Sequence, residues 1–385
     1  MKPQPEKLKR ISNRISGDGY NYRRFAKFSM LAAILLLLLA CSTGRQSTWD
    51  PVGPVAETQL LIFNVLLWVM VAIFVGVEGI LVYAAVRYRR RPGQALPEQS
   101  HGNMPLEITW TIIPTVLIMA LGIWSVVVLY QLDEPPASAN DVLNVHVTGH
   151  QWWFEFEYEN AGGGKRIVTA NELKMPVGRP IRLTMESDDV IHSFWVPKLA
   201  GKVDIVPTRT NHMWFQADSA KIDSLPQILY GQCAEFCGIA HALMKFQVIV
   251  MDQQDYDAWV DNYGPPPTTT AQAQKGQQLF GQCAMCHSVD GNNDSSAQDS
   301  RREAFLAGGA LAPAPNLTDL RTRRSLAAGL MDLNKDTFKS WVKNPDAIKP
   351  GNSMQARAAH LYGSGQLSLS DDDLDALAAY LLNLQ

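Results

Sequence analysis

The sequence has little excess charge of either sign. Its 385 residues include 34 Lys and Arg against 37 Asp and Glu, so the formal net charge is −3. A nucleic-acid-binding protein would carry a strong basic excess on some face, so this balance argues against that class. The cysteines number only five, and an odd count argues against a pure disulfide framework. With 46% hydrophobic and 18% charged residues, the chain is not disordered and has the length of two or three domains.

The N-terminus has the pattern of an export signal. Eight Lys and Arg residues lie within residues 1–30, and an apolar run, Met30–Ala40, follows and stops at Cys41. At 1.5 Å per residue this run spans only about 16 Å, too short for a membrane of about 30 Å. The pattern predicts a signal peptide over residues 1–40. Its end resembles the bacterial lipobox, which implies lipidation of Cys41; an uncleaved anchor with an incidental cysteine is the alternative.

Two long apolar runs predict a transmembrane hairpin within residues 41–134. The first, Leu60–Val86, contains a single carboxylate, Glu78, and the second, Ile108–Tyr130, contains no charge. Arginines at positions 87, 89, 90 and 91 mark the connecting loop as cytoplasmic, so everything after Asp133 is expected outside. For Glu78 two interpretations stay open: a carboxylate that reaches the interface or a partner helix, and part of a proton path.

Glu107 precedes the second apolar run in the stretch L-E-I-T-W-T-I-I-P. Pro114 in this stretch frees a backbone carbonyl, which needs a neighbour inside a membrane. The stretch resembles the E-x-x-W-T-x-x-P pattern that opens the second helix of cytochrome c oxidase subunit II. That resemblance implies that Glu107 lies at the cytoplasmic mouth of a proton channel in a partner subunit.

Residues 141–252 change to short alternating runs. Leu143, Val145 and Val147 alternate with polar residues, and aromatic residues alternate with glutamates over residues 153–158. Many short strands of this kind, separated by Gly and Pro turns, predict a β-sandwich or a small barrel.

The densest chemistry lies in residues 233–244, C-A-E-F-C-G-I-A-H-A-L-M. Thiolate and thioether sulfurs suit Cu(I), and imidazole suits both oxidation states of copper. A second imidazole must come from elsewhere, and His192 in D-V-I-H-S-F is the best placed. A zinc site of two cysteines and two histidines is an alternative that leaves Met244 without a role, and a disulfide is another.

This combination resembles the dinuclear copper A site of oxidase subunit II, in a cupredoxin-like domain over residues 135–262. The resemblance implies two copper ions bridged by both cysteines, one histidine on each copper, and a carbonyl and a thioether completing the site. It also implies a magnesium ion, shared with subunit I, on the glutamate side chain. The implied copper ligands are His192, Cys233, Glu235, Cys237, His241 and Met244, with Glu235 also at the magnesium.

An aromatic stretch, G-H-Q-W-W-F over residues 149–154, resembles the strip through which this family receives electrons from cytochrome c. The resemblance implies that Trp152 is the point of electron input, as an exposed indole would allow. Ordinary core packing is the alternative, and it suits Trp153 better than Trp152.

A second redox module follows a Pro/Thr linker over residues 263–270. Residues 271–280 predict a helix that leads into C-A-M-C-H, the attachment pattern of a c-type haem with Cys283 and Cys286 as thioethers and His287 as an axial ligand. A thioredoxin-like dithiol is the alternative, but no βαβ pattern surrounds it. An all-α domain over residues 271–385 is expected, with an apolar terminal helix capped by Asp371–Asp373.

The sixth haem ligand is expected to be Met354. It ends an extended Pro/Gly loop, K-P-G-N-S-M, while the runner-up Met331 lies beside a predicted helix. The stretch from Trp341 to Met354 resembles class I cytochromes c.

The whole chain resembles the subunit II of caa-type bacterial oxidases, a multidomain membrane protein. The resemblance implies that electrons pass from cytochrome c, or another external donor, through haem c and copper A to the oxygen-reducing centre of subunit I in a proton-pumping oxidase. The implied partners are subunits I and III and the lipid bilayer of the bacterial inner membrane, with both redox domains on the periplasmic face. Two alternatives stay open: the copper A subunit of a nitric oxide reductase, which Glu107 and its context disfavour, and a copper-binding membrane lipoprotein.

Overall fold

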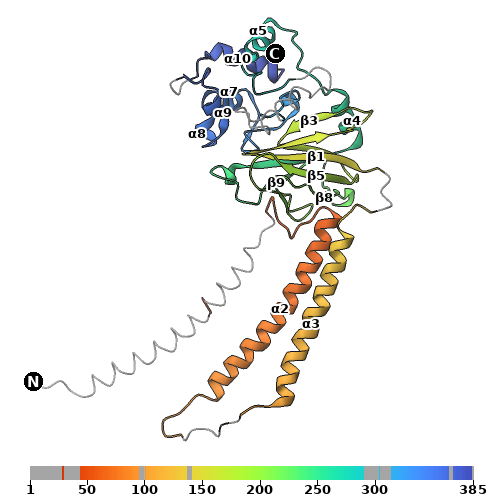
Figure 1. The fold of residues 1–385 in the computed structure, drawn as a ribbon, viewed down its shortest axis with the longest axis vertical. Helices are drawn as coiled ribbons and strands as arrows, with labels where there is room; N and C mark the ends of the chain where they lie inside the picture. The colour runs from red at the N-terminus through yellow and green to blue at the C-terminus, as the bar shows by residue number, and fades with distance from the viewer. Residues whose placement is uncertain are drawn as a thin grey trace, which may run out of the picture. The chain divides into compact units, whose positions relative to one another are not determined.

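The computed structural model describes residues 28–29, 44–94, 99, 101–136, 141–289, 303, 314–363 and 367–383 (Figure 1). Cys41 and the predicted signal peptide, except residues 28–29, lie outside these residues. The chain divides into two units, residues 1–45 and 46–385, and the elements below belong to the second.

Two helices are long and apolar enough to cross a membrane, α2 (Pro54–Arg87) and α3 (Met104–Gln131). Both begin earlier than the apolar runs predicted. Helix α2 has Pro54 in its first turn, a position that needs no backbone N–H, and the side chain of Asn103 caps α3 by accepting the N–H of Leu106. Helix α3 continues through Pro114. The hairpin packs on the following domain where the Trp214 indole donates to the carbonyl of Leu132 at 3.0 Å.

The predicted β domain is a sandwich of two five-stranded sheets, called the sandwich below. One sheet has the order β3-β2-β1-β5-β8 and the other β4-β10-β9-β6-β7. Helix α4 (Gln253–Asp261), which the sequence analysis did not predict, packs beside β4. The strand bounds are β1 Leu143–His150, β2 Trp153–Tyr158, β3 Ile167–Ala170, β4 Glu172–Pro176, β5 Ile181–Ser187, β6 His192–Trp195, β7 Val203–Ile205, β8 Asn211–Phe215, β9 Gln227–Cys233 and β10 Lys245–Met251. Short 3-10 turns lie at η1 (Ser219–Lys221) and η2 (His241–Leu243).

Strand β2 differs from the alternating exposure that its sequence suggests. Phe154 and Phe156 are buried in the core between the sheets, and Trp153 and Glu155 on the other face are also buried. Trp153 packs with Ala170 of β3 and with Ala328, which belongs to the region after the linker. The second face of β2 is therefore covered by a distant part of the chain rather than by water.

The region after the linker, called the C-terminal region below, is mostly helical. Its first helix, α5 (Ala271–Phe280), has the predicted bounds and is capped by Thr270. The terminal helix α10 (Asp371–Leu381) also matches, but its cap is Ser370 in a capping box with Asp373. Helices α5 and α10 cross closely, since a Cβ on Gly276 would lie 2.0 Å from the carbonyl oxygen of Ala376. The remaining elements are η3 (Leu320–Thr322), β11 (Ser325–Leu326), β12 (Met331–Asp332), α7 (Lys335–Lys343), α8 (Pro345–Ile348) and α9 (Ser353–Arg357).

Candidate functional site

Two sulfurs lie at the centre of a cluster at one end of the sandwich. Cys233 ends β9, and Cys237 lies in the loop that follows. Their Sγ atoms are 3.8 Å apart, both side chains are buried, and neither is in a disulfide. The disulfide alternative is therefore absent from this structure. The hydrogen bond between the two thiols lowers the pKa of Cys233, and the same pairing raises the pKa of Cys237.

The two sulfurs face different histidines. The Nδ1 atom of His192 lies 4.0 Å from the Sγ of Cys233, and the Nδ1 atom of His241 lies 3.5 Å from the Sγ of Cys237. His192 is the first residue of β6 rather than part of the preceding turn. A Cβ on Gly149 of the neighbouring sheet would lie 2.8 Å from the His192 ring, so only glycine leaves room for this imidazole.

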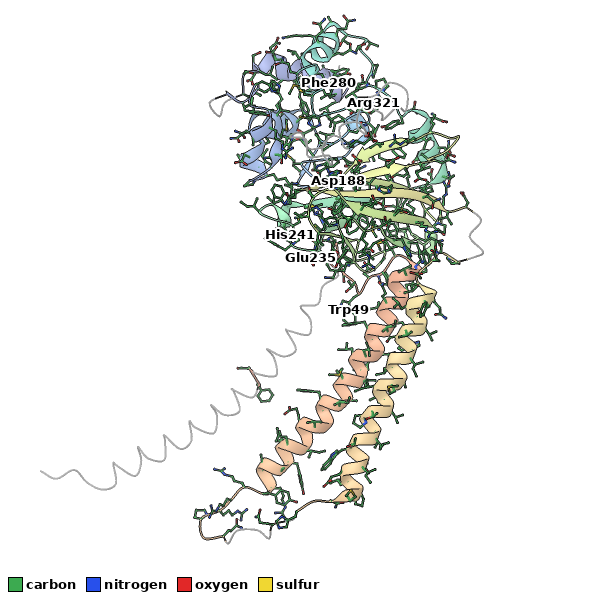
Figure 2. All side chains as sticks on the ribbon, in the orientation of Figure 1. Trp49, Asp188, Glu235, His241, Phe280 and Arg321 are labelled. Carbon is green, nitrogen blue, oxygen red and sulfur yellow. The ribbon has the colours of Figure 1, made fainter. Side chains whose placement is uncertain are left out.

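Two further donors complete the cluster. The Sδ of Met244 is 3.8 Å from the Sγ of Cys237, and the carbonyl oxygen of Glu235 is 3.2 Å from the Sγ of Cys233. Figure 2 labels Glu235 and His241 on the loop that carries the cysteines. The structure thus brings together all six residues that the sequence analysis selected. Met244, which a zinc site would leave without a role, contacts the sulfur of Cys237. Two thiols, two imidazoles and a thioether are a donor set that fits copper better than zinc, which takes only four ligands here.

Asp189 orients His192, a role that the sequence analysis did not assign. Its carboxylate accepts the Nε2–H of His192 at 2.8 Å and the backbone N–H of Gln151 at 2.7 Å. Burial would lower the pKa of His192, but the hydrogen bond to Asp189 and the contact with Cys233 outweigh burial and raise it. The carboxylate three residues before the histidine in D-V-I-H was the available signal, because a metal-bound imidazole commonly donates its second N–H to a carboxylate.

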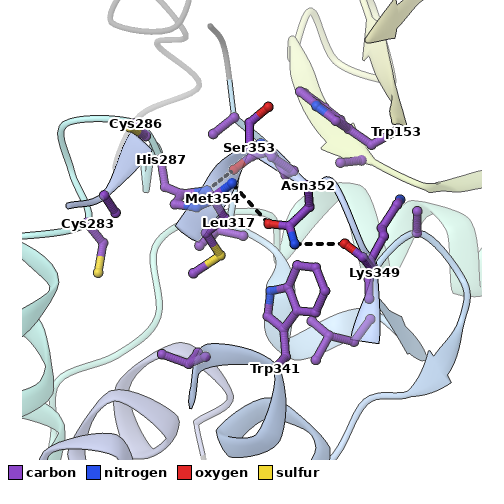
Figure 3. A pocket seen from close by; sticks show the side chains of 18 of the residues that line it. Trp153, Cys283, Cys286, His287, Leu317, Trp341, Lys349, Asn352, Ser353 and Met354 are labelled. Atoms are coloured by element: carbon purple, nitrogen blue, oxygen red, sulfur yellow. Dashed lines mark hydrogen bonds between the residues drawn. The ribbon is translucent and has the colours of Figure 1, made fainter. Parts of the chain in front are cut away.

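A second site is a mostly apolar pocket in the C-terminal region. Cys283, Cys286, His287 and Met354 all line it (Figure 3). Neither cysteine is in a disulfide, and the Nδ1 atom of His287 lies 2.8 Å from the carbonyl oxygen of Pro315. That contact fixes the ring and directs its other nitrogen to the pocket. The pair of thiols, the imidazole and the apolar lining fit a covalently attached haem.

Among the described residues, Met354 lines this pocket and Met331 does not. Met354 is the second residue of the short helix α9, so it begins a helical turn rather than ending an extended loop. The side chain of Asn352 caps this turn by accepting the N–H of Met354 at 3.0 Å. Met331 lies in strand β12, away from the lining.

Family models and curated relatives match most of the chain. Family models match the transmembrane domain of cytochrome c oxidase subunit II at residues 44–128, its periplasmic domain at residues 160–252, and cytochrome c at residues 273–385. Cytochrome c oxidase subunit 2 of Alkalihalophilus pseudofirmus is 34% identical over 94% of this chain and 98% of its own length. The chain belongs to the cytochrome c oxidase subunit 2 family.

Cytochrome c oxidase subunit 2 of Bacillus subtilis is similar to the same extent, with 36% identity over 92% of this chain and 96% of its own length. The solved periplasmic domain of subunit II from Bradyrhizobium japonicum is 30% identical and covers 33% of this chain and 94% of that one, with a TM-score of 0.28. This oxidase subunit II is therefore part of a haem–copper oxidoreductase complex in a membrane. Its families imply copper and haem, and it carries a periplasmic domain and a cytochrome c domain.

Trp152 of this subunit II touches both sites. Its indole Nε1 donates to the carbonyl of Cys237 at 3.0 Å, and the Nε2 of Gln151 donates to the same oxygen at 2.7 Å. The ammonium of Lys349, from the pocket loop of the C-terminal region, donates to the backbone carbonyl of Trp152. Burial lowers the pKa of Lys349 to about 7. Trp152 is half-buried rather than exposed as expected, because it packs against the core of the sandwich and the loop with Lys349 and Gly351 lies against it.

The sandwich also supplies a wall of the haem pocket. His150, Trp152 and Trp153 line the pocket together with the cytochrome c residues. Lys349 and Gly351 approach this wall, and a Cβ on Gly351 would lie 2.3 Å from the side chain of Ile239 in the copper loop. Gly351 has a φ of +82°, so the position favours glycine both by its backbone and by this contact. Sequence reasoning missed this wall because the motifs of the two domains are separate.

The two carboxylates of the apolar helices, Glu107 and Glu78, lie in different surroundings. Glu107 accepts the backbone N–H of Asn103 at 3.0 Å and lies in the first turn of α3. Glu78 is exposed on α2. Neither the Glu107 contact nor the exposure of Glu78 assigns a proton path.

Proposed function

We propose that this subunit II receives electrons at a haem c in its C-terminal region and passes them through a copper A centre to subunit I. One observation carries the proposal: Trp152 contacts both the copper loop and the haem-pocket loop, through the carbonyl of Cys237 and the ammonium of Lys349. A single residue thus links the two candidate sites. We propose Trp152 as the point of electron input to copper, with the chain's own haem as its immediate donor and cytochrome c, or another periplasmic or membrane-bound donor, upstream.

The copper centre is proposed to hold two copper ions, which share one electron when bound. Cys233 and Cys237 would bridge them, with His192 and the carbonyl of Glu235 near one sulfur and His241 and Met244 near the other. Asp189 keeps the Nδ1 atom of His192 directed at sulfur by holding the proton on Nε2. The buried position of both cysteines excludes water from the sulfurs.

The haem is proposed to be attached through Cys283 and Cys286, with His287 and Met354 as axial ligands. Haem c supplies one-electron chemistry at a potential that its axial ligands tune. The carbonyl of Pro315 holds the His287 ring, and Asn352 caps the turn that carries Met354. These contacts would hold both residues in place.

Several finer assignments follow from the family resemblance. The side chain of Glu235 is proposed to bind a magnesium ion shared with subunit I, and subunits I and III are the proposed partners. Cys41 is proposed as a lipid-modified residue after removal of residues 1–40. The chain is proposed to cross the bacterial inner membrane twice, at α2 and α3, with both redox domains on the periplasmic face. The proposed domain boundaries are those predicted, at residues 41, 135, 263 and 271.

Glu107 is proposed to admit protons at the cytoplasmic end of α3 in a proton-pumping oxidase. Its place in the first turn of an apolar helix supports this role, since ionisable residues at membrane helices often mark proton paths. The variant Glu107→Gln is expected to slow oxygen turnover and leave reduction of copper A by the donor unchanged. Unchanged turnover across pH would reduce Glu107 to a helix cap.

The complex purified through this chain tests the function. We expect reduction of oxygen, optical spectra of a c-type haem, and an electron paramagnetic resonance (EPR) signal of mixed-valence copper. Reduction of nitric oxide in place of oxygen would support the reductase alternative, which the comparisons do not favour. Copper without haem would support a copper-binding lipoprotein.

A further inference from the structure

Beside the haem pocket, buried polar side chains join the sandwich to the C-terminal region. We call this group the interface cluster. The sandwich contributes side chains from β3 and β4, and the C-terminal region contributes side chains from the two flanks of η3 and from β11. The members are Thr169, Glu172, Lys174, Asp319, Arg323 and Ser325, and each is at most 8% exposed. Charged residues are seldom buried unless they are paired and hydrogen-bonded, so the charged side chains of the interface cluster depend on the partners that they meet at the interface.

Asp319 is the acceptor at one end of the interface cluster. Its carboxylate accepts the hydroxyl of Thr169 at 3.1 Å and the guanidinium of Arg323 at 2.8 Å, and it lies 3.9 Å from the ammonium of Lys174. Burial would raise the pKa of Asp319, but Arg323 and Lys174 outweigh burial and lower it. The carboxylate is therefore charged and is held by donors from both sides of the interface.

Glu172 is the acceptor at the other end. One of its oxygens accepts the backbone N–H of Arg324 at 2.9 Å, the backbone N–H of Ser325 at 2.7 Å and the hydroxyl of Ser325 at 2.7 Å. All three donors belong to the C-terminal region. Such a set of donors defines the position of β11 on the sandwich, because a small slide would break several bonds at once.

The charges of the interface cluster balance. Lys174 and Arg323 supply two positive groups, against the carboxyl groups of Glu172 and Asp319. Lys174 also donates to the hydroxyl of Thr322 at 2.7 Å and lies 4.9 Å from the ring centre of Trp259. Displacement of the C-terminal region would leave buried charges without their partners, which disfavours other docked positions.

The interface cluster is continuous with the wall of the haem pocket. Arg323 and Ser325 line that pocket themselves, and Ala328, three residues beyond Ser325, packs on Trp153. A contact that fixes β11 therefore also fixes the pocket relative to the sandwich and the copper loop. Electron tunnelling weakens steeply with distance, so a fixed separation matters for transfer between the two sites.

We propose that the interface cluster docks the cytochrome c domain in one fixed position, so that it works as a stationary relay rather than as a mobile tethered shuttle. Glu172 and Asp319 are the positioning residues of this relay, and neither touches the reacting groups. The functional part of the inference rests on the proposed function, whereas docking itself does not.

Hydrogen exchange of the full chain tests the docking directly. In Glu172→Lys the amides of Arg324 and Ser325 lose their acceptor, and we expect their exchange to accelerate by more than about tenfold. Glu172→Gln keeps an acceptor oxygen, so the amides of Arg324 and Ser325 should exchange much more slowly in it than in the lysine variant. The matched control is Asp261→Lys, which makes the same charge change at an exposed ion pair with Lys165. If Glu172→Lys does not fold, Ser325→Ala removes only the hydroxyl donor, and a smaller acceleration is expected.

Flash-induced electron transfer from haem c to copper A, measured in the assembled complex, tests the relay. In the unmodified complex a docked domain should transfer electrons in a fast phase. In Glu172→Lys this phase should be lost and the remaining electron transfer should depend on solvent viscosity, while the haem spectrum and the copper EPR signal persist. The inference would be overturned if amide exchange at residues 324 and 325 were unchanged in both Glu172→Lys and Ser325→Ala. It would also be overturned if exchange accelerated while the fast phase of electron transfer stayed unchanged. Absence of copper and haem signals in the unmodified complex would instead overturn the proposed function and leave the exchange result standing.

Discussion

The two candidate redox sites of this subunit II are assembled over very different lengths of chain. The copper cluster takes five of its six residues from positions 233–244 and adds only His192. The haem pocket takes its candidate ligands from positions 283–287 and 354, and residues 150–153 of the other domain also line it. The first site is therefore local to one loop, while the second depends on how two domains dock. The difference predicts that damage to the copper loop stays local and damage to the docking surface reaches the haem.

The largest expected effect comes from removing a bridging sulfur. Cys237→Ser should abolish the mixed-valence two-copper EPR signal completely, because a dinuclear centre needs both thiolates. Absorption of the haem should survive, since its ligands lie in another domain. The reciprocal control is Cys283→Ser, which should disturb haem attachment and leave the copper signal intact. Loss of both signals in both variants would break the comparison.

Removing the haem thioether is expected to have the next largest effect. Met354→Ala should lower the haem potential and remove the weak methionine–iron band in the red, because a thioether stabilises reduced iron. Haem should stay attached through Cys283 and Cys286. Met331→Ala is the control, because that residue lies away from the pocket, and only a packing effect is expected. The opposite outcome, with the band lost in Met331→Ala alone, would show that the wrong methionine has been assigned.

A smaller effect is expected from the carboxylate that orients His192. Asp189→Asn keeps the size of the side chain but weakens the bond to Nε2, so copper affinity should fall by about 10–100-fold. Copper titration followed by the EPR signal measures this change. The control Asp204→Asn alters an exposed carboxylate on the neighbouring strand β7 and should leave the affinity unchanged. Equal affinities in the two variants would mean that the loop alone orients the imidazole.

The smallest expected effect is a pH dependence at Lys349. Its folded pKa of about 7 lies below the usual 10.5, so between these values the unfolded chain binds more protons than the folded chain. Stability should therefore rise with pH in this window, by at most about 1.4 kcal/mol per pH unit. Thermal unfolding of the full chain at pH 7 and pH 9 measures the slope, and Lys349→Met should flatten it. An identical slope in both proteins would remove Lys349 as its source.

The sequence by itself determined much of this protein. Apolar run length predicted α2 and α3, short alternating runs predicted the sandwich, and helical periodicity predicted α5 and α10. Each of these signals is local, because the residues that produce it are neighbours in the chain. The candidate copper residues could be selected for the same reason, since most of them share one loop and the spacing of their side chains reflects its geometry.

Only the tertiary structure decided what covers the second face of β2. Local alternation at residues 153–158 implied a solvent-facing side, yet Trp153 and Glu155 are buried. Trp152, expected to be exposed, is half-buried, and Lys349 gained its role from a contact with a residue 197 positions away, which no spacing encodes. Burial and hydrogen bonding depend on which distant segments meet. Periodicity therefore specified the strands and helices, whereas docking of the two domains specified the surroundings of their redox sites.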